Sequence, residues 1–386
     1  MVRDTYLPVD LDAALLLGRA WLGAPTDGPA VITVRGDRVV DLSEHVSTVS
    51  ELLDHPECVA IVRDAPGKTV GSLDALLANS LAGHSQAPYL LAPCDLQPVK
   101  ASGVTFAVSL LERVIEEQAG GDPSKADDIR QSMYELIGGD LSSVRPGSAE
   151  AQALKTEFQR RGIWSQYLEV GIGPDAEVFS KAPPMASVGF GAAIGLHPDS
   201  TWNNPEPEIV LAISSRGDVV GAALGNDVNL RDIEGRSALL LTKAKDNNAS
   251  CAIGPFIRLF DERFDMDAVR SAEVSLRIEG RDGFALDAVS YMSEISRDPL
   301  ALVRQTIGTH HQYPDGVMLF LGTMFSPTQD RDAPGGGFTH HIADRVSISS
   351  PRLGSLVNEV GLSTEVEPWR FGLRALFSHL SKRLEG

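Results

Sequence analysis

In the stretch Asn203-Asn204-Pro205-Glu206-Pro207-Glu208-Ile209-Val210-Leu211-Ala212-Ile213, two carboxylates stand two residues apart at the start of an apolar run. The apolar run is typical of a β-strand, in which residues i and i+2 point to the same face. Glu206 and Glu208 would then be adjacent like charges, which is unfavourable unless a cation or a proton lies between them. The stretch therefore predicts a strand with a candidate metal site at its beginning.

A third carboxylate, Asp227, follows a second strand-like run, Asp218 to Leu224. The connection Ser214-Ser215-Arg216-Gly217 is typical of a hairpin turn, and a hairpin would return Asp227 to the two glutamates. Three clustered oxygen ligands with open positions describe a site for Mg²⁺ or Mn²⁺ that is accessible to a substrate. The alternative is a pair of solvent-facing acids at a strand end, with Asp227 in a turn.

Composition limits the classes of function. The 386 residues suggest two to three domains, and the hydrophobic content of 43% is sufficient for a substantial core. The formal net charge of −18 makes nucleic acids and anionic membranes poor partners. The acidic residues are spread along the chain rather than collected in a tail, which fits a soluble enzyme.

The cysteine content and the N-terminal segment indicate in which cellular compartment the protein is expected. The three cysteines form no C-x-x-C pair, which favours a reducing cytoplasm over a disulfide scaffold or a structural zinc site. Residues 1–10 include two acids and no long apolar stretch, so we expect no signal peptide. No apolar run reaches the roughly 18 residues of a transmembrane helix.

The pattern along the chain predicts a small N-terminal domain over residues 1–95 and a catalytic domain over residues 96–386. Within the first, residues 30–40 are typical of a β-hairpin, and residues 47–53 and 72–81 have helical spacing of apolar side chains. No catalytic constellation is evident in this N-terminal part.

The catalytic part begins with a helical region that extends to about residue 164. Its portion from about 113 to 165 is a helical insertion that either covers a site or is a solvated decoration. Residues 178–360 contain many short strands with turn signals, which favours a rolled or sandwiched β-structure.

Two further residue types are candidates for proton transfer. Lys245 follows the carboxylates in the chain and could support a developing enolate or act as a base, although Lys243 could fill the same role. Glu112 lies on a predicted helix, either as an acid–base group or as an exposed helical acid. Spacing alone does not choose between these alternatives.

Other motifs do not support a competing chemistry. The glycines of residues 189–195 have G-x-G-x-x-x-G spacing and no surrounding βαβ unit, so we reject a dinucleotide site. The pairs His310-His311 and His340-His341 are consecutive, and neighbours on a strand point to opposite faces, so they are expected in loops or at the surface. The alternative is that one of them contacts a substrate. A G-x-S-x-G elbow is absent, which disfavours a serine hydrolase.

These residues together resemble the fumarylacetoacetate hydrolase superfamily over about residues 100–360. The resemblance implies an α+β fold with a mixed β-roll catalytic domain, a small N-terminal α+β domain, a homodimer or higher homo-oligomer, and a divalent metal, Mg²⁺ or alternatively Mn²⁺. It implies that Glu206, Glu208 and Asp227 hold the metal, and that Glu112 and Lys245 are catalytic. Substrate contacts are implied for Ser109, Lys181, Arg231 and Thr323. The matching segments are Phe179 to Pro184, Glu206-Pro207-Glu208, Asn226 to Asp232, Lys245 to Ser250 and Leu321-Gly322-Thr323.

One departure from the superfamily pattern bears on the reaction. Hydrolases of this kind carry Asn-Tyr-x-x-His-x-x-Glu, whereas the run from Thr105 to Glu112 keeps the glutamate and has Ser109 in place of the histidine. Because that histidine activates water in the family, its absence disfavours hydrolysis. The stretches 226–236 and 243–255 resemble the branch that dehydrates 2-keto-3-deoxy-D-pentonates, derived from D-xylonate or D-arabinonate, to 2,5-dioxopentanoate.

In the expected mechanism, Mg²⁺ binds the carboxylate and C2 ketone of the substrate and stabilises an enolate. Glu112 and Lys245 share proton removal from C3 and support of the oxyanion, with roles that could be exchanged, and the C4 hydroxyl leaves as water. The alternatives are a hydrolase of a 2,4-dioxo acid, a decarboxylase of a small 2-oxo acid and a catalytically silent protein that binds sugar acids.

Overall fold

A computed structural model describes residues 5–137, 144–162 and 164–384. Among these residues, eleven strands form one mixed sheet, whose only parallel pair joins β16 and β6. In spatial order the strands are β4 (Lys68–Ser72), β3 (Arg38–Asp41), β2 (Gly28–Arg35), β1 (Leu16–Leu22), β13 (Cys251–Leu259), β11 (Val219–Asp227), β10 (Pro207–Ile213), β16 (Val317–Phe320), β6 (Val99–Ser102) and β7 (Val178–Ala182), with β5 (Tyr89–Leu90) paired to β1.

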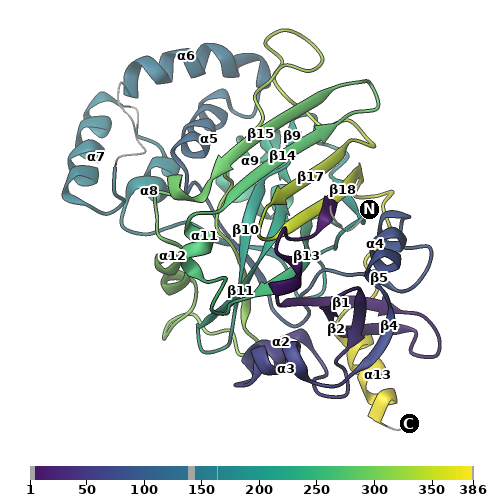
Figure 1. Ribbon diagram of the computed structural model, residues 1–386. Coiled ribbons are helices and arrows are strands. Elements are labelled where there is room, and N and C mark those ends of the chain that lie inside the picture. Colours follow the sequence, from purple (N-terminus) through teal and green to yellow (C-terminus); the bar gives the residue numbers. More distant parts are fainter. Residues whose placement is uncertain (1–4, 138–143, 163, 385–386) are drawn as a thin grey trace.

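Two smaller sheets complete the β-structure of the described chain. Five strands form the second sheet, and β9 (Asn203–Asn204) pairs with β12 (Asn229–Leu230) beside the large one. The ribbon shows the second sheet in front of β10, β11 and β13 (Figure 1). Its strands in spatial order are β15 (Ala285–Tyr291), β14 (Glu273–Glu279), β17 (Arg345–Ser350), β18 (Gly354–Leu362) and β8 (Ala193–Leu196). The fold is thus a mixed α and β structure with mixed sheets.

Helices surround the sheets and fall into groups. Four of them, α5 (Ala107–Ala119), α6 (Ala126–Ile137), α7 (Ala149–Arg161) and α8 (Gln166–Ile172), lie between β6 and β7 in sequence and together at one side of the molecule (Figure 1). Residues 138–143 and 163 of the predicted insertion, and residues 1–4 of the N-terminal segment, lie outside the described residues. The other helices are α2 (Val49–Asp54), α3 (Cys58–Asp64), α4 (Leu73–Leu81), α9 (Arg231–Glu234), α10 (Leu241–Lys245), α11 (Met266–Arg270), α12 (Pro299–Thr306) and α13 (Leu373–Leu384).

Strand β10 lies inside the large sheet, between β11 and β16, and all seven of its residues are buried. Ile209 and Leu211 belong to one apolar cluster, whereas Val210 and Ala212 belong to a second one. Because alternate side chains point to opposite faces, each face of β10 is covered by its own core. A strand buried on both faces is expected to be continuously apolar, as this one is.

The predicted hairpin at residues 30–40 is confirmed by β2 and β3, and the predicted helical segments at 47–53 and 72–81 are confirmed by α2 and α4. Helix α4 begins at Leu73 because the Ser72 hydroxyl accepts the backbone N–H of Ala75. The division of the chain near residue 95 stays a prediction, and β1 pairs directly with β13 across it. No helix in the described ranges combines the length and apolar character needed to cross a lipid bilayer.

Candidate metal centre and active site

The predicted hairpin brings the three carboxylates together. Strands β10 and β11 are antiparallel, with Pro207 opposite Asn226, and the Asp227 N–H donates to the carbonyl oxygen of Glu206 over 3.1 Å. One carboxylate oxygen from each of Glu206, Glu208 and Asp227 lies within 4.8 Å of the others, and all three residues are buried. The spacing of the glutamates along a strand and the turn that follows are therefore sufficient to assemble the set.

The electrostatics of this set favour a bound cation. Burial, together with the charges of Asp227 and Glu206, raises the pKa of Glu208 well above its usual range. Its carboxylate accepts a hydrogen bond from the backbone N–H of Gly322 at 2.6 Å. Three buried carboxylates at this separation are stable only when a positive charge or a proton is shared among them. Oxygen donors of this kind suit Mg²⁺ or Mn²⁺.

Two lysines approach the carboxylates from different elements. The Lys245 amine, at the end of α10, lies 2.6 Å from Glu206 Oε2 and 3.2 Å from Asp227 Oδ2. Lys181, on β7, lies 2.7 Å from the other oxygen of Asp227. Burial alone lowers the pKa of Lys245, but the carboxylates of Asp227 and Glu206 raise it above its ordinary value, so the amine is a cation. Lys243 instead pairs with the exposed Asp199 at 2.7 Å, so the structure selects Lys245.

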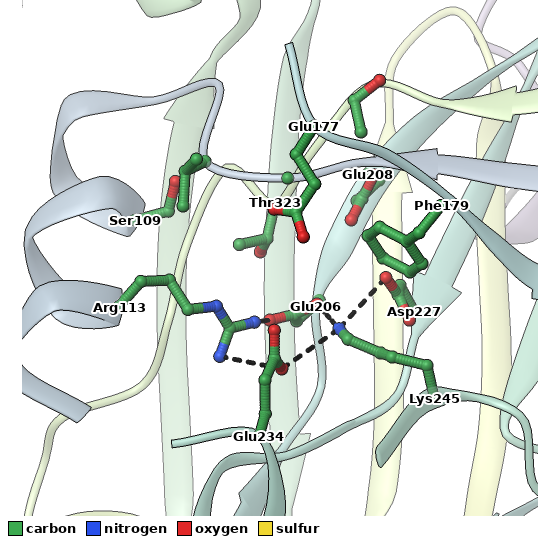
Figure 2. A pocket seen from close by; sticks show the side chains of 13 residues that line it. Ser109, Arg113, Glu177, Phe179, Glu206, Glu208, Asp227, Glu234, Lys245 and Thr323 are labelled. Atoms are coloured by element: carbon green, nitrogen blue, oxygen red, sulfur yellow. Dashed lines mark hydrogen bonds and ion pairs between the residues drawn. The ribbon is translucent and has the colours of Figure 1, made fainter. Parts of the chain in front are cut away.

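Helix α5 presents a buried polar stripe to the same place. Ser109, Glu112, Arg113 and Glu116 follow the spacing of three and four residues that defines one helix face, and all are buried. The Arg113 guanidinium forms an ion pair with Glu206 and lies 2.6 Å from Glu116. Figure 2 shows Arg113 extending from the helix toward the metal ligands.

Two carboxylates that the sequence did not single out line the cavity. Glu177 precedes β7, is half-buried, and has a pKa that burial raises. A Cβ atom on Gly103 would overlap its carboxylate, so the glycine makes room for it. Glu234, the last residue of α9, lies 3.2 Å from Arg113. Neither belongs to a recognisable motif, although Glu234 is one turn after the buried Arg231.

Two predicted substrate-contacting residues, Ser109 and Thr323, also line this cavity, as does the aromatic ring of Phe179. The Ser109 hydroxyl donates to the carbonyl oxygen of Phe106 at 2.9 Å, and the Thr323 hydroxyl donates to the carbonyl oxygen of Phe325 at 3.0 Å. The free space is about that of one water molecule. No histidine lines the cavity within the described part of the chain.

Glu112, Lys181 and Arg231 are not brought to the cavity wall. Glu112 is held by two arginines, with Arg130 at 2.9 Å and Arg231 at 3.0 Å. Arg231 also pairs with Glu116 at 2.6 Å and donates to the carbonyl oxygen of Pro327. Lys181 contacts Asp227 from behind the ligand set. The structure thus places these three residues in support of the site.

The ionisable groups form what we call the buried charge cluster, in which seven carboxylates face five cations among the described residues. The excess of two negative charges equals the charge of one divalent cation, which supports the assignment of the metal site to Glu206, Glu208 and Asp227. The members of the cluster are Glu112, Glu116, Glu177, Glu206, Glu208, Asp227 and Glu234 with Arg113, Arg130, Lys181, Arg231 and Lys245.

Comparisons with solved structures place the fold. The chain superposes on an apo form of 2-keto-3-deoxy-D-arabinonate dehydratase with a TM-score of 0.62 and 22% identity, covering 90% of this chain and 99% of that one. The same enzyme complexed with magnesium and 2,5-dioxopentanoate gives a TM-score of 0.62 and 21% identity at the same coverage. Fumarylacetoacetate hydrolase from Exiguobacterium antarcticum matches with a TM-score of 0.54 and 15% identity, covering 90% and 99%.

Comparisons with characterised sequences give the family. A protein of Haloferax volcanii named "Probable 2-keto-3-deoxyxylonate dehydratase" is 35% identical over 269 residues, which are 69% of this chain and 73% of the relative. A 2-dehydro-3-deoxy-D-arabinonate dehydratase of Saccharolobus solfataricus is 31% identical over 188 residues, 48% of this chain and 58% of the relative. A search of protein-family models finds no match. The chain belongs to the 2-keto-3-deoxypentonate dehydratase family, which shares its fold with the fumarylacetoacetate hydrolases.

Proposed function

We propose that this protein is a metal-dependent hydro-lyase that converts 2-keto-3-deoxy-D-pentonate, from D-xylonate or D-arabinonate, to 2,5-dioxopentanoate and water. The observation that carries the proposal is the buried triad of Glu206, Glu208 and Asp227 with a separate carboxylate, Glu177, on the same cavity. Membership of a dehydratase family supports the same reaction. A solved relative of the fold is described as a complex with magnesium and 2,5-dioxopentanoate.

The triad would hold Mg²⁺, or Mn²⁺ as the alternative, because its oxygens are clustered, buried and short of positive charge. When bound, the cation supplies Lewis acidity that makes a hydrogen next to the substrate ketone more acidic. Lys181 and Lys245 would hold the orientation of the Asp227 and Glu206 carboxylates through their ion pairs. The Gly322 N–H fixes the rotation of the Glu208 carboxylate in the same way.

Glu177 is the proposed base that removes the C3 proton, a role that the sequence left open between Glu112 and Lys245. Its carboxylate lines the cavity and forms no ion pair in the described chain, whereas both oxygens of Glu112 are bound by arginines. Burial raises the pKa of Glu177, which strengthens it as a proton acceptor once ionised. Glu112 would then act as a positioning residue for Arg231.

The remaining roles follow from position. The Lys245 ammonium lies at the cavity wall and would stabilise negative charge that develops on the substrate. Thr323 and Ser109 would donate or accept hydrogen bonds with the hydroxyls of the sugar acid. Lys181 would hold Asp227, and Arg231 would hold Glu112 and Glu116, without either cation contacting the substrate. The wall must move to admit a five-carbon acid, because the free space is only about that of one water molecule.

Ser109 separates this reaction from C–C bond hydrolysis. A hydrolytic water needs a nearby base such as an imidazole, and no histidine lines the described cavity. The Ser109 hydroxyl donates to a carbonyl of its own helix start and has no basic nitrogen. A site of this composition favours proton removal and loss of a hydroxyl.

The test is to incubate the purified protein with Mg²⁺ and either 2-keto-3-deoxy-D-xylonate or 2-keto-3-deoxy-D-arabinonate. We expect release of 2,5-dioxopentanoate, loss of activity in EDTA, and recovery when Mg²⁺ is restored. Pyruvate with a second fragment, or carbon dioxide, would instead identify cleavage of a C–C bond and overturn the proposal.

Three finer features accompany the proposed function. We propose a β-roll around β10 and β11, a helical insertion formed by α5 to α8, and a homodimer, all on the basis of the family resemblance. Cys58, Cys94 and Cys251 are free and buried, which suits a protein of the reducing cytoplasm. Light scattering of the purified protein would test the homodimer.

A further inference from the structure

Glu234 is a buried carboxylate on the cavity wall that the mechanism above does not use. It ends helix α9, and its residue is 4% exposed. Its Oε2 atom accepts no hydrogen bond from the described part of the chain, although the nearest nitrogen of Arg113 is 3.2 Å away and Lys245 Nζ is 3.9 Å away. Figure 2 shows this carboxylate directed at both cations, below the metal ligands. It is therefore a polar atom directed into the cavity whose hydrogen-bonding capacity is unused.

Charge neutrality points to a proton on one carboxyl group. One divalent cation balances the buried charge cluster, and the monoanionic substrate then adds a negative charge in a cavity with little water. Uptake of one proton would restore the balance. The reaction itself requires such a group, because the C4 hydroxyl leaves readily only as water.

The other carboxylates are poor choices for this proton. Glu206 and Asp227 are bound to lysines, and Glu116 is bound to two arginines, so that each charge is already compensated. Glu208 is committed to the metal, and Glu177 must be ionised to accept the C3 proton. Glu112, away from the cavity, is also held by two arginines. Glu234 remains.

The surroundings of Glu234 favour its protonated form. Burial raises its pKa to about 7, opposed by the cations Arg113 and Lys245 and assisted by the charges of Glu206 and Glu116. Tyr167, on α8, interacts with it electrostatically and is buried as well. The groups that face it thus come from α5, α8, α10 and the start of β10.

We propose that Glu234 is the general acid of the dehydration, an inference that rests on the proposed function. The C3 proton passes to Glu177, the C3–H electron pair becomes the C3–C4 double bond, and the C4–O bond breaks. The departing oxygen takes the Glu234 proton and leaves as water. In the rearrangement, Glu177 returns its proton to C3, and the C–H proton lost from C5 restores Glu234, which leaves a C4–C5 enol. Transfer of the enol O–H proton to C4 then gives the aldehyde. Atoms and charges balance over the cycle.

The alternative is that Glu234 is only a counter-ion for Arg113. Glu116 offers a matched control, because it also faces Arg113, at 2.6 Å, but does not line the cavity. Glu234→Gln and Glu116→Gln each remove one negative charge from the surroundings of the same guanidinium. Only the first removes a group that can deliver a proton to the substrate.

The experiment separates the base step from the acid step. 2-Oxopentanoate has no C4 hydroxyl, so exchange of its C3 hydrogens in D₂O reports proton removal alone, and release of 2,5-dioxopentanoate from 2-keto-3-deoxy-D-xylonate reports the whole reaction. We expect Glu234→Gln to keep the exchange rate and to lose roughly 10²–10⁴-fold in dehydration. Glu116→Gln should change the two rates together.

If the wild-type protein is active, two results would overturn the inference about Glu234 alone. The first is dehydration by Glu234→Gln at the wild-type rate. The second is an equal loss of the exchange rate and the dehydration rate in that variant. An inactive wild-type protein would overturn the proposed function and this inference with it. A readout besides activity is the infrared carbonyl band of a protonated carboxyl. It should titrate near neutral pH in the wild-type protein, vanish in Glu234→Gln and persist in Glu116→Gln, and its persistence in Glu234→Gln would contradict the assignment.

Discussion

Arg113, on helix α5, forms an ion pair with Glu206, the first carboxylate of the proposed metal triad. A side chain from the helical segment between β6 and β7 thus contributes positive charge to the metal centre. The same guanidinium lies 2.6 Å from Glu116 and 3.2 Å from Glu234, so it compensates three buried carboxylates. The helix and the strand hairpin are therefore coupled through charge.

Replacement of Arg113 by glutamine should destabilise the metal-free protein. Removal of one partner of a buried ion pair typically costs about 3–5 kcal/mol because it leaves an uncompensated charge. Added Mg²⁺ should stabilise Arg113→Gln more than it stabilises the wild-type protein, since the cation replaces part of the lost charge. Thermal unfolding with EDTA and with Mg²⁺ measures both effects. Equal responses of the two proteins to Mg²⁺ would show that Arg113 and the metal site are independent.

Glu208→Gln should have the opposite effect on the metal-free protein. The folded-state pKa of Glu208 is raised by burial, Asp227 and Glu206, so the folded protein holds this proton more tightly than the unfolded chain. Glutamate then lowers stability above its ordinary pKa of about 4.3, and glutamine removes that penalty at pH 7. We expect a higher melting temperature in EDTA and no further rise with Mg²⁺. A preserved Mg²⁺ response would exclude Glu208 from the ligand set.

Glu177→Gln and Glu112→Gln should differ in what they damage. Glu177→Gln should lower turnover by about 10²–10⁴-fold with little change in stability, because its carboxylate is free of ion pairs in the described chain. Glu112→Gln should lower the free energy of unfolding by about 1–3 kcal/mol through its two arginines, with a smaller loss of turnover. Steady-state kinetics and urea unfolding of both variants provide the comparison. A larger loss of turnover in Glu112→Gln than in Glu177→Gln would identify Glu112 as the base.

Gly103→Ala should reduce activity through a single methyl group. The new Cβ would overlap the Glu177 carboxylate and push it from its place, whereas the backbone conformation of Gly103 suits any residue. Gly308→Ala is a matched control, because a Cβ there meets no atom within 4 Å. We expect kcat to fall in the first variant only, with similar melting temperatures for both. Equal kcat values would mean that the position of Glu177 is unimportant.

His340 should make a contribution to stability that is lost as the pH falls below neutral. Burial lowers the pKa of His340 despite its contact with Asp344 at 3.2 Å. The unfolded chain therefore takes up this proton at a higher pH than the folded protein, and stability is lost as pH falls through the ordinary value of about 6.5. In His340→Gln, the free energy of unfolding measured with urea should depend less on pH between pH 7 and pH 5.5, roughly the range in which an ordinary histidine titrates. His310→Gln, at an exposed position, should leave the slope unchanged.

The metal triad was predictable because its determinants are local. Two carboxylates on alternate strand residues and a four-residue turn define which side chains meet, whatever surrounds them. The choice between Lys245 and Lys243 needed the direction of each side chain at the end of α10. That direction is set by the packing of the helix on β12 and β7, which spacing does not describe.

The residues proposed for proton transfer were harder to predict for two physical reasons. Neighbouring residues on a helix differ by about 100° in direction, so Glu112 and Arg113 on α5 reach different partners. Glu177 belongs to no motif and reaches the cavity because β6 and β7 pair beside the glycine at position 103. Such a contact depends on tertiary structure. The spacing of the polar residues at 109, 112, 113 and 116 along one predicted helix is a local signal that could have pointed to Arg113.

The pairing of β1 with β13 has a consequence for the stability of shortened chains. Strand β13 is buried along its whole length and lies between β1 and β11, which carries Asp227. Removal of residues 1–95 would leave the end of β13 at Ile257 and Arg258 as an exposed strand edge with unpaired backbone groups. An apolar edge of this kind recruits strands from other molecules. A truncated chain should therefore aggregate before it can bind metal.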